Sequence, residues 1–248
     1  MIAAFRAELR RLISLRSTGV YAVMLLGCFF GPIIIMAAVY DAEYQGPIDA
    51  SDIGKCISIF HVLAIIFSGA YTATEIRSGS TAIAFLTQTS RYLSLVAHYV
   101  VEGVFLVCAF AIGIPLALLA GMLYPDGLEI GVGALPYWGL YLGIVLVWSS
   151  MATSIAVITR SVAAAVATPI TWMLLIEQLL AQIPMFDAIT PWLPFAASHS
   201  LLARSLGEAT SVYPALATAF AILSPAFLLG VLSFTLHCKR DALTRDAI

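Results

Sequence analysis

Polar side chains interrupt the long apolar runs of this sequence at two places, and such residues commonly mark function in membrane proteins. His98 and Glu102 are four residues apart, so on a helix they share one face and can form a hydrogen bond or an ion pair. Glu102 would then line a polar pathway, act as a gating contact or hold helices together. Glu177 and Gln178 are adjacent and point about 100° apart, so at most one faces a given neighbour. They would lie near the outer exit of a pathway or serve helix packing.

The composition places these residues in a membrane. Of the 248 residues, 61% are hydrophobic and 10% are charged, and the mean hydropathy is +0.99. A soluble domain carries about 25% charged residues. The four cysteines and four histidines are dispersed along the chain, which predicts neither a disulfide framework nor a metal site. We therefore expect an integral membrane protein without a metal centre of its own.

The distances between charged residues predict how often the chain crosses the membrane. A helix needs about 20 predominantly apolar residues to cross. The whole chain, 1–248, is expected to be one all-α domain: a polytopic membrane protein with six transmembrane helices. The predicted helices cover residues 17–40, 56–74, 92–123, 135–159, 162–183 and 214–237.

Two segments between the predicted helices have a different character. Residues 75–91 form a compact polar island, which must lie outside the hydrocarbon. Residues 184–213 are apolar but contain Pro191 and Pro194, with Trp192 suited to the membrane interface. We expect this second segment to be a short extracellular re-entrant or interfacial segment before the sixth helix.

The positions of the basic residues predict the orientation. Six crossings place ten of the twelve basic residues on the side that also holds both termini, and the positive-inside rule makes that side cytoplasmic. We expect the inner (plasma) membrane of a bacterium. The ten residues are Arg6, Arg10, Arg11, Arg16, Arg77, Arg91, Arg160, Lys239, Arg240 and Arg245.

Residues 1–16 are too charged to cross a membrane but show helical periodicity. Apolar side chains recur at Ile2, Phe5, Leu9, Leu12 and Ile13. The basic residues Arg6, Arg10 and Arg11 are expected on another face. This pattern predicts an amphipathic helix on the inner membrane surface, where its basic face meets anionic lipid headgroups.

Within the island, Glu75, Gly79, Thr87, Ser90 and Arg91 fall without a gap on a known pattern, and Ser80 stands for its threonine. In these residues the island at 75–91 resembles the signature that follows the second transmembrane helix of type-2 ATP-binding-cassette exporter permeases. Gln88 and Ala82 depart from the pattern, at positions that are often proline and acidic. The resemblance implies an elbow helix before the first crossing and an ATPase-coupling segment, in which Glu75 and Arg91 could pair. The residues assigned to coupling are Glu75, Arg77, Gly79, Ser80, Thr87, Ser90 and Arg91.

The same resemblance implies partners. Such a permease forms half of a translocation pathway, together with a second permease copy or a similar permease, and binds two separate ATPase subunits. The sequence lacks a phosphate-binding loop, because Gly54, Lys55 and Cys56 do not complete that motif. No cofactor is expected in this chain, ATP and Mg would be bound by the partner, and no nucleic acid is expected. The family often has a lysine where this chain has His98.

Two alternatives remain open from the residues alone. An intramembrane serine protease would need a serine matched to a histidine. Ser68 lacks the usual glycine two residues before it, and His199 is expected outside the membrane. An ion-coupled carrier usually shows internal repeats, which the sequence does not display. The scarcity of charge within the spans favours a hydrophobic or amphipathic solute, such as a drug, peptide or lipid.

Overall fold

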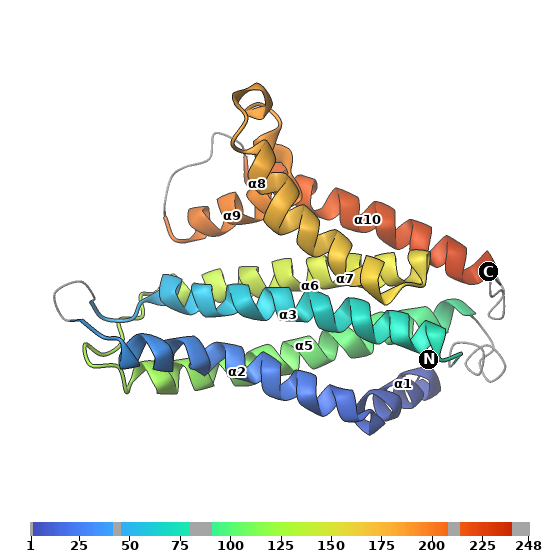
Figure 1. The fold of residues 1–248 in the computed structure, drawn as a ribbon, viewed down its shortest axis with the longest axis horizontal. Helices are drawn as coiled ribbons and strands as arrows, with labels where there is room; N and C mark the ends of the chain where they lie inside the picture. The colour runs from blue at the N-terminus through green and yellow to red at the C-terminus, as the bar shows by residue number, and fades with distance from the viewer. Residues whose placement is uncertain (1, 42–45, 80–90, 208–213, 240–248) are drawn as a thin grey trace.

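Six long helices dominate the computed structural model, which describes residues 2–41, 46–79, 91–207 and 214–239 (Figure 1). Each is long and apolar enough to cross a membrane, so the chain is a multi-pass membrane protein. The described residues contain no β-strand. The six are α2 (Arg16–Ala38), α3 (Ala50–Arg77), α5 (Arg91–Gly121), α6 (Ala134–Thr159), the run from α7 to α8 (Val162–Leu180) and α10 (Ala215–Lys239).

Helices α2, α3, α5 and α6 run side by side, while α7 to α8 rises away from them at an angle (Figure 1). The inclined run is α7 (Val162–Thr171), a π-helical turn (Trp172–Ile176) and α8 (Glu177–Leu180). The π-helical turn follows Pro169, which has no N–H to continue the α-helical ladder. Glu177 follows directly after this turn and is buried.

Two shorter helices lie beside the six long ones. Helix α1 (Ile2–Ser14) packs at one end of the bundle, against α5 and α2. Helix α9 (Pro194–Ser205) packs against α10 and α6 near the other end. The first and last described residues both lie at the end that carries α1, here called the α1 end (Figure 1).

The core lies along α3 and α6, the most enclosed helices, with 61% and 56% of their most apolar windows buried. Phe29, Phe60 and Phe110 meet there at centroid distances of 5.1 to 5.8 Å, joining α2, α3 and α5. Trp148 of α6 is fully buried. Aromatic packing of this kind adds about 0.5–1.5 kcal/mol per pair beyond area burial.

The end opposite α1 is closed by backbone contacts between two loops. The Ile48 N–H donates to Gly127 O at 3.1 Å, and the Glu129 N–H donates to Ile48 O at 2.9 Å. Asp49 then starts α3 by accepting the N–H groups of Ser51 and Asp52. Burial alone would raise the pKa of Asp49, but these hydrogen bonds lower it below its usual value.

Close contact between α3 and α7 depends on a glycine. A Cβ atom at Gly69 would lie 2.9 Å from the carbonyl oxygen of Ala165, and backbone cannot move aside as a side chain can. We expect Gly69→Ala to destabilise the protein by about 1–3 kcal/mol, the usual cost of overpacking. Thermal unfolding in mild detergent measures this.

Gly27→Ala is the matched control for this prediction. Gly27 also lies within a helix, α2, but a Cβ there meets no atom within 4 Å. Alanine also has the higher helix propensity, so this variant should unfold at the same temperature or a higher one. Equal losses in both variants would contradict the steric account.

Candidate functional site

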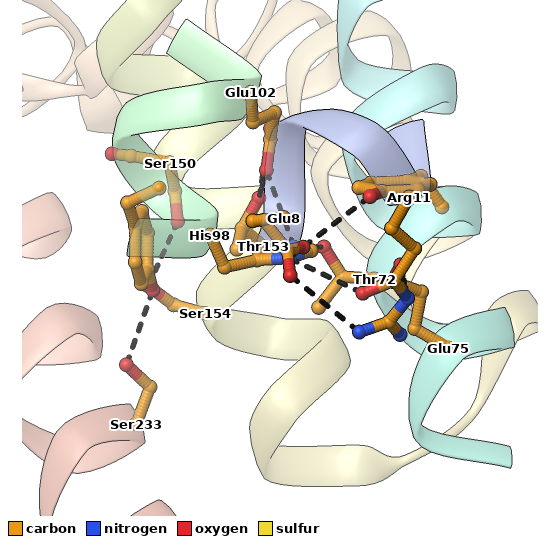
Figure 2. A network of polar contacts seen from close by, with 12 residues as sticks. Glu8, Arg11, Thr72, Glu75, His98, Glu102, Ser150, Thr153, Ser154 and Ser233 are labelled. Atoms are coloured by element: carbon orange, nitrogen blue, oxygen red, sulfur yellow. Dashed lines mark hydrogen bonds and ion pairs between the residues drawn. The ribbon is translucent and has the colours of Figure 1, made fainter. Parts of the chain in front are cut away.

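Four ionisable side chains from three helices meet at the α1 end of the bundle (Figure 2). Glu8 and Arg11 come from α1, Glu75 comes from the last turns of α3, and His98 comes from α5. Three of them are buried and Arg11 is partly buried. We call these four residues the α1 cluster.

The pattern of α1 explains why two of its charged residues face the bundle. Ala4, Glu8 and Leu12 recur every four residues and are all buried, so they form one face. Arg11 lies one turn after Glu8, with its Nη1 atom 3.5 Å from Glu8 Oε2. Arg6 and Arg10 are exposed. Arg11 was expected to share their face, but the structure places its side chain against the bundle.

His98 is the centre of the cluster. Its Nδ1 atom lies 2.7 Å from Glu8 Oε1 and 3.3 Å from Glu75 Oε2. Glu75 Oε1 is 2.6 Å from Arg11 Nε. Tyr71 stacks on the imidazole at a centroid distance of 5.1 Å and an interplanar angle of 7°, and its hydroxyl donates to Glu8 at 3.3 Å. Each charge of the cluster therefore has an opposite charge or a donor beside it.

The electrostatics of the cluster depend on the imidazole. Burial by itself raises the pKa of Glu8, but the neighbouring His98 and Arg11 lower it below the usual value. With both carboxylates ionised, the four residues are neutral only when His98 carries a proton. A buried charge without a partner costs several kcal/mol, so the protonated imidazole is an integral part of the docking of α1.

A second contact of His98 extends the polar chain into the bundle. Its Nε2 atom lies 2.8 Å from Thr72 Oγ1 and 3.7 Å from Glu102 Oε2. Glu102 is 3% exposed and accepts the Thr153 hydroxyl of α6, at 2.9 Å to Oε1 and 2.8 Å to Oε2. The predicted His98 and Glu102 pair is therefore present, at a distance longer than a direct hydrogen bond.

A small cavity opens beside the cluster. Its volume is about 40 Å³, enough for a few water molecules at about 10–15 Å³ each. Helices α1, α3, α5, α6 and α10 all contribute to its wall. The polar lining residues are Glu8, Arg11, Thr72, Glu75, Ser94, His98 and His237.

The α1 cluster also contains the one group of possible metal ligands among the described residues. Donor atoms of Glu8, Glu75 and His98 lie within 4.8 Å of one another. Arg11 already pairs with Glu75, and a protonated imidazole balances the remaining charge. Because a cation would have to displace that proton or the guanidinium, we interpret the group as an ion-pair network.

Glu177 forms a separate polar site near the far end of the bundle. Its carboxylate accepts the backbone N–H groups of Phe195 (3.0 and 3.1 Å) and Ala196 (2.9 Å), at the start of α9. The Trp172 indole N–H donates to the same carboxylate at 2.6 Å. The adjacent Gln178 is exposed. Of the two residues predicted here, Glu177 therefore binds the N-terminal end of α9, where the helix dipole is positive.

Four of the residues assigned to coupling, Glu75, Arg77, Gly79 and Arg91, lie at the α1 end. Arg77 ends α3, and Gly79 follows in a left-handed conformation with φ of +75° that favours glycine. Arg91 begins α5 and donates from Nη1 to the carbonyl oxygen of Cys238 at 3.3 Å, which links α5 to α10. Ser80, Thr87 and Ser90 lie outside the described residues.

Sequence reasoning missed Glu8, Thr72 and Thr153. One signal was available for Glu8, because it is the single acidic residue in a basic helix and lies four residues before Leu12. The two threonines carried no such signal, since a threonine in an apolar helix commonly bonds only to its own backbone.

No protein-family model matches the chain, and no curated protein is significantly similar to it. The function is therefore inferred from the geometry and the sequence pattern.

Arg11 should hold α1 against the bundle. We expect Arg11→Ala to expose the buried Leu12 position, because Glu75 and Glu8 lose a counter-charge. The pair is partly exposed, so an effect of about 1 kcal/mol, or about fivefold, is expected. The measurement is the maleimide labelling rate of Leu12→Cys in a background without the native cysteines.

Arg10→Ala is the control for charge removal alone. Arg10 is exposed on the same helix, so its loss should leave the labelling rate of Leu12→Cys unchanged. If both variants accelerate labelling equally, α1 is held by general attraction to lipid instead of the Arg11 contact.

Glu177 and Gln178 make a second matched pair for mutation. Glu177→Ala removes the acceptor for two partly buried backbone N–H groups and should cost about 1–3 kcal/mol. Gln178→Ala changes an exposed side chain and should have little effect. Thermal unfolding in detergent compares them, and equal stability of the two variants would refute the capping role.

Proposed function

We propose that the chain is the membrane subunit of an ATP-driven exporter, with ATP hydrolysed by a separate subunit. One observation carries this proposal: α1, which lies outside the six long helices, is joined by ion pairs to α3 and α5. These two helices flank the polar island 75–91, the segment that resembles an ATPase-coupling signature. A force applied there would act on α1, α3 and α5 together.

The orientation follows from the positions of the basic residues. Arg6, Arg10, Arg77 and Arg91 belong to the α1 end, which the positive-inside rule assigns to the cytoplasm. In this orientation α1 is the elbow helix on the inner surface. Helix α9 then forms the extracellular re-entrant segment, anchored by Glu177.

The exporter would contain two permease chains and two ATPase subunits. One chain offers six spanning helices and so one wall of a pathway, and the second wall would come from another copy or a similar permease. ATP and Mg would bind only to the ATPase. Exposed side chains of the spanning helices are largely apolar, which suits a hydrophobic or amphipathic solute, and the exposed Gln178 is a candidate pathway residue.

The arrangement of Ser68 and His199 favours transport over proteolysis. Ser68 lies within α3, whereas His199 lies on α9 and packs edge-on against Phe195 at a centroid distance of 4.4 Å. A serine nucleophile requires a base within hydrogen-bond reach. No such contact joins these two residues in the part of the chain that the structure describes.

Native mass measurement tests the assembly. The chain would be purified in mild detergent together with an ATPase encoded beside it, and we expect two permease chains and two ATPase subunits. Transport by the isolated chain without any ATPase would refute the proposal.

Coupling variants test the same proposal in proteoliposomes. Glu75→Ala should reduce solute exported per ATP hydrolysed while the complex still forms, because Arg11 and His98 lose their shared partner. Lys55→Ala is the control, since this exposed ion pair with Asp52 lies at the opposite end of α3. Equal transport per ATP in both variants would contradict a coupling role.

A further inference from the structure

His98 lies between two carboxylates and contacts them with different ring nitrogens. Nδ1 faces Glu8 at 2.7 Å, and Nε2 faces Glu102 at 3.7 Å (Figure 2). Imidazole can accept a proton at one nitrogen and release another proton from the second. His98 can therefore hold Glu8 through Nδ1 while Nε2, which also lies 2.8 Å from Thr72 Oγ1, passes a proton to Glu102.

The two carboxylates differ in their access to water. Glu8, Glu75 and His98 line the cavity of about 40 Å³, but Glu102 does not. Glu102 lies one helical turn deeper on α5, nearer the middle of the helix. In the part of the chain that the structure describes, His98 is the titratable group between the cavity and Glu102.

Glu102 is suited to a variable protonation state. The Thr153 hydroxyl is a single donor shared by its two oxygens, and His98 is the cationic group beside it. An isolated carboxylate near the centre of a bilayer is strongly disfavoured. A proton on Glu102 removes that cost, and a protonated His98 offsets it.

We propose that Glu102 is a proton-binding site within the membrane, which exchanges protons with water at the α1 end through His98. In the inward step the N–H bond at His98 Nε2 breaks and an O–H bond forms at Glu102, which leaves a neutral imidazole that keeps its proton at Nδ1. Nε2 then takes a new proton from cavity water through the Thr72 hydroxyl, which lies 2.8 Å from Nε2 and lines the cavity. The net charge of His98 and Glu102 together does not change in the first transfer. A movement of about 1 Å brings the two groups to hydrogen-bond distance.

Proton exchange at Glu102 would also act on α1. While His98 is neutral, Glu8 and Glu75 face each other with Arg11 as the remaining cation of the cluster. The docking of α1 is then weaker until the imidazole is protonated again. The titratable and charged groups that face His98 and Glu102 are Glu8 and Arg11 of α1, Tyr71 and Glu75 of α3, Tyr99 of α5, and His237 of α10.

Infrared difference spectroscopy tests the proton-binding site directly. The purified chain in lipid nanodiscs would be titrated between about pH 5 and pH 9. We expect a carbonyl band of a protonated carboxyl group that appears on acidification, shifts in deuterium oxide and is lost in Glu102→Gln. Glu102→Asp keeps the carboxyl group and should move the band in frequency, which separates loss of the site from loss of the fold. Glu177→Gln should retain the band.

The relay is tested by the rate of protonation after a pH jump. His98→Gln should slow the appearance of the Glu102 band at least tenfold, whereas His237→Gln, which alters the same cavity wall, should leave the rate within twofold. A band that persists in Glu102→Gln, or equal rates in the wild type and His98→Gln, would overturn the proposal. The experiment needs no ATPase, so its failure would leave the proposed export function standing.

Discussion

The pairing of buried charges at the α1 end is the constraint on which the arrangement of the helices depends. Arg11, Glu75, His98 and Glu8 come from three helices, and removing one partner would leave a charge uncompensated in a buried setting. Apolar contacts between helices tolerate small shifts, but an ion pair with a separation of 2.6 Å does not. The positions of α1, α3 and α5 along their axes are therefore fixed relative to one another.

Both polar sites join a short helix to the long helices that cross the membrane. At the α1 end the partners are ionised side chains. At the far end the Glu177 carboxylate meets the free N–H groups at the start of α9, so the helix dipole takes the place of a cation. The difference matters, because backbone N–H groups cannot lose a proton. At the Glu177 contact only the carboxyl group can change its charge, whereas the α1 cluster holds titratable groups on both sides of its contacts.

The spanning helices could be predicted from the sequence because lipid leaves the backbone no alternative to helix, and hydropathy alone then identifies each run. His98 and Glu102 could be placed on one face by helical spacing. The roles of Arg10 and Arg11 could not be told apart, since the rotation of α1 is set by docking against α3 and α5. The Glu177 contact joins residues 18 and 19 positions apart across a turn, and no local pattern encodes it.

A histidine at position 98 does something that a lysine could not. A lysine ammonium has three donors on one nitrogen, so it could balance Glu8 and Glu75 as a point charge. It could not present a second nitrogen on the opposite edge toward Glu102. The planar ring also allows Tyr71 to stack at a centroid distance of 5.1 Å, which restricts the plane of the imidazole. Imidazole thus connects the charge balance that docks α1 to the protonation of a carboxyl group deep in the bundle.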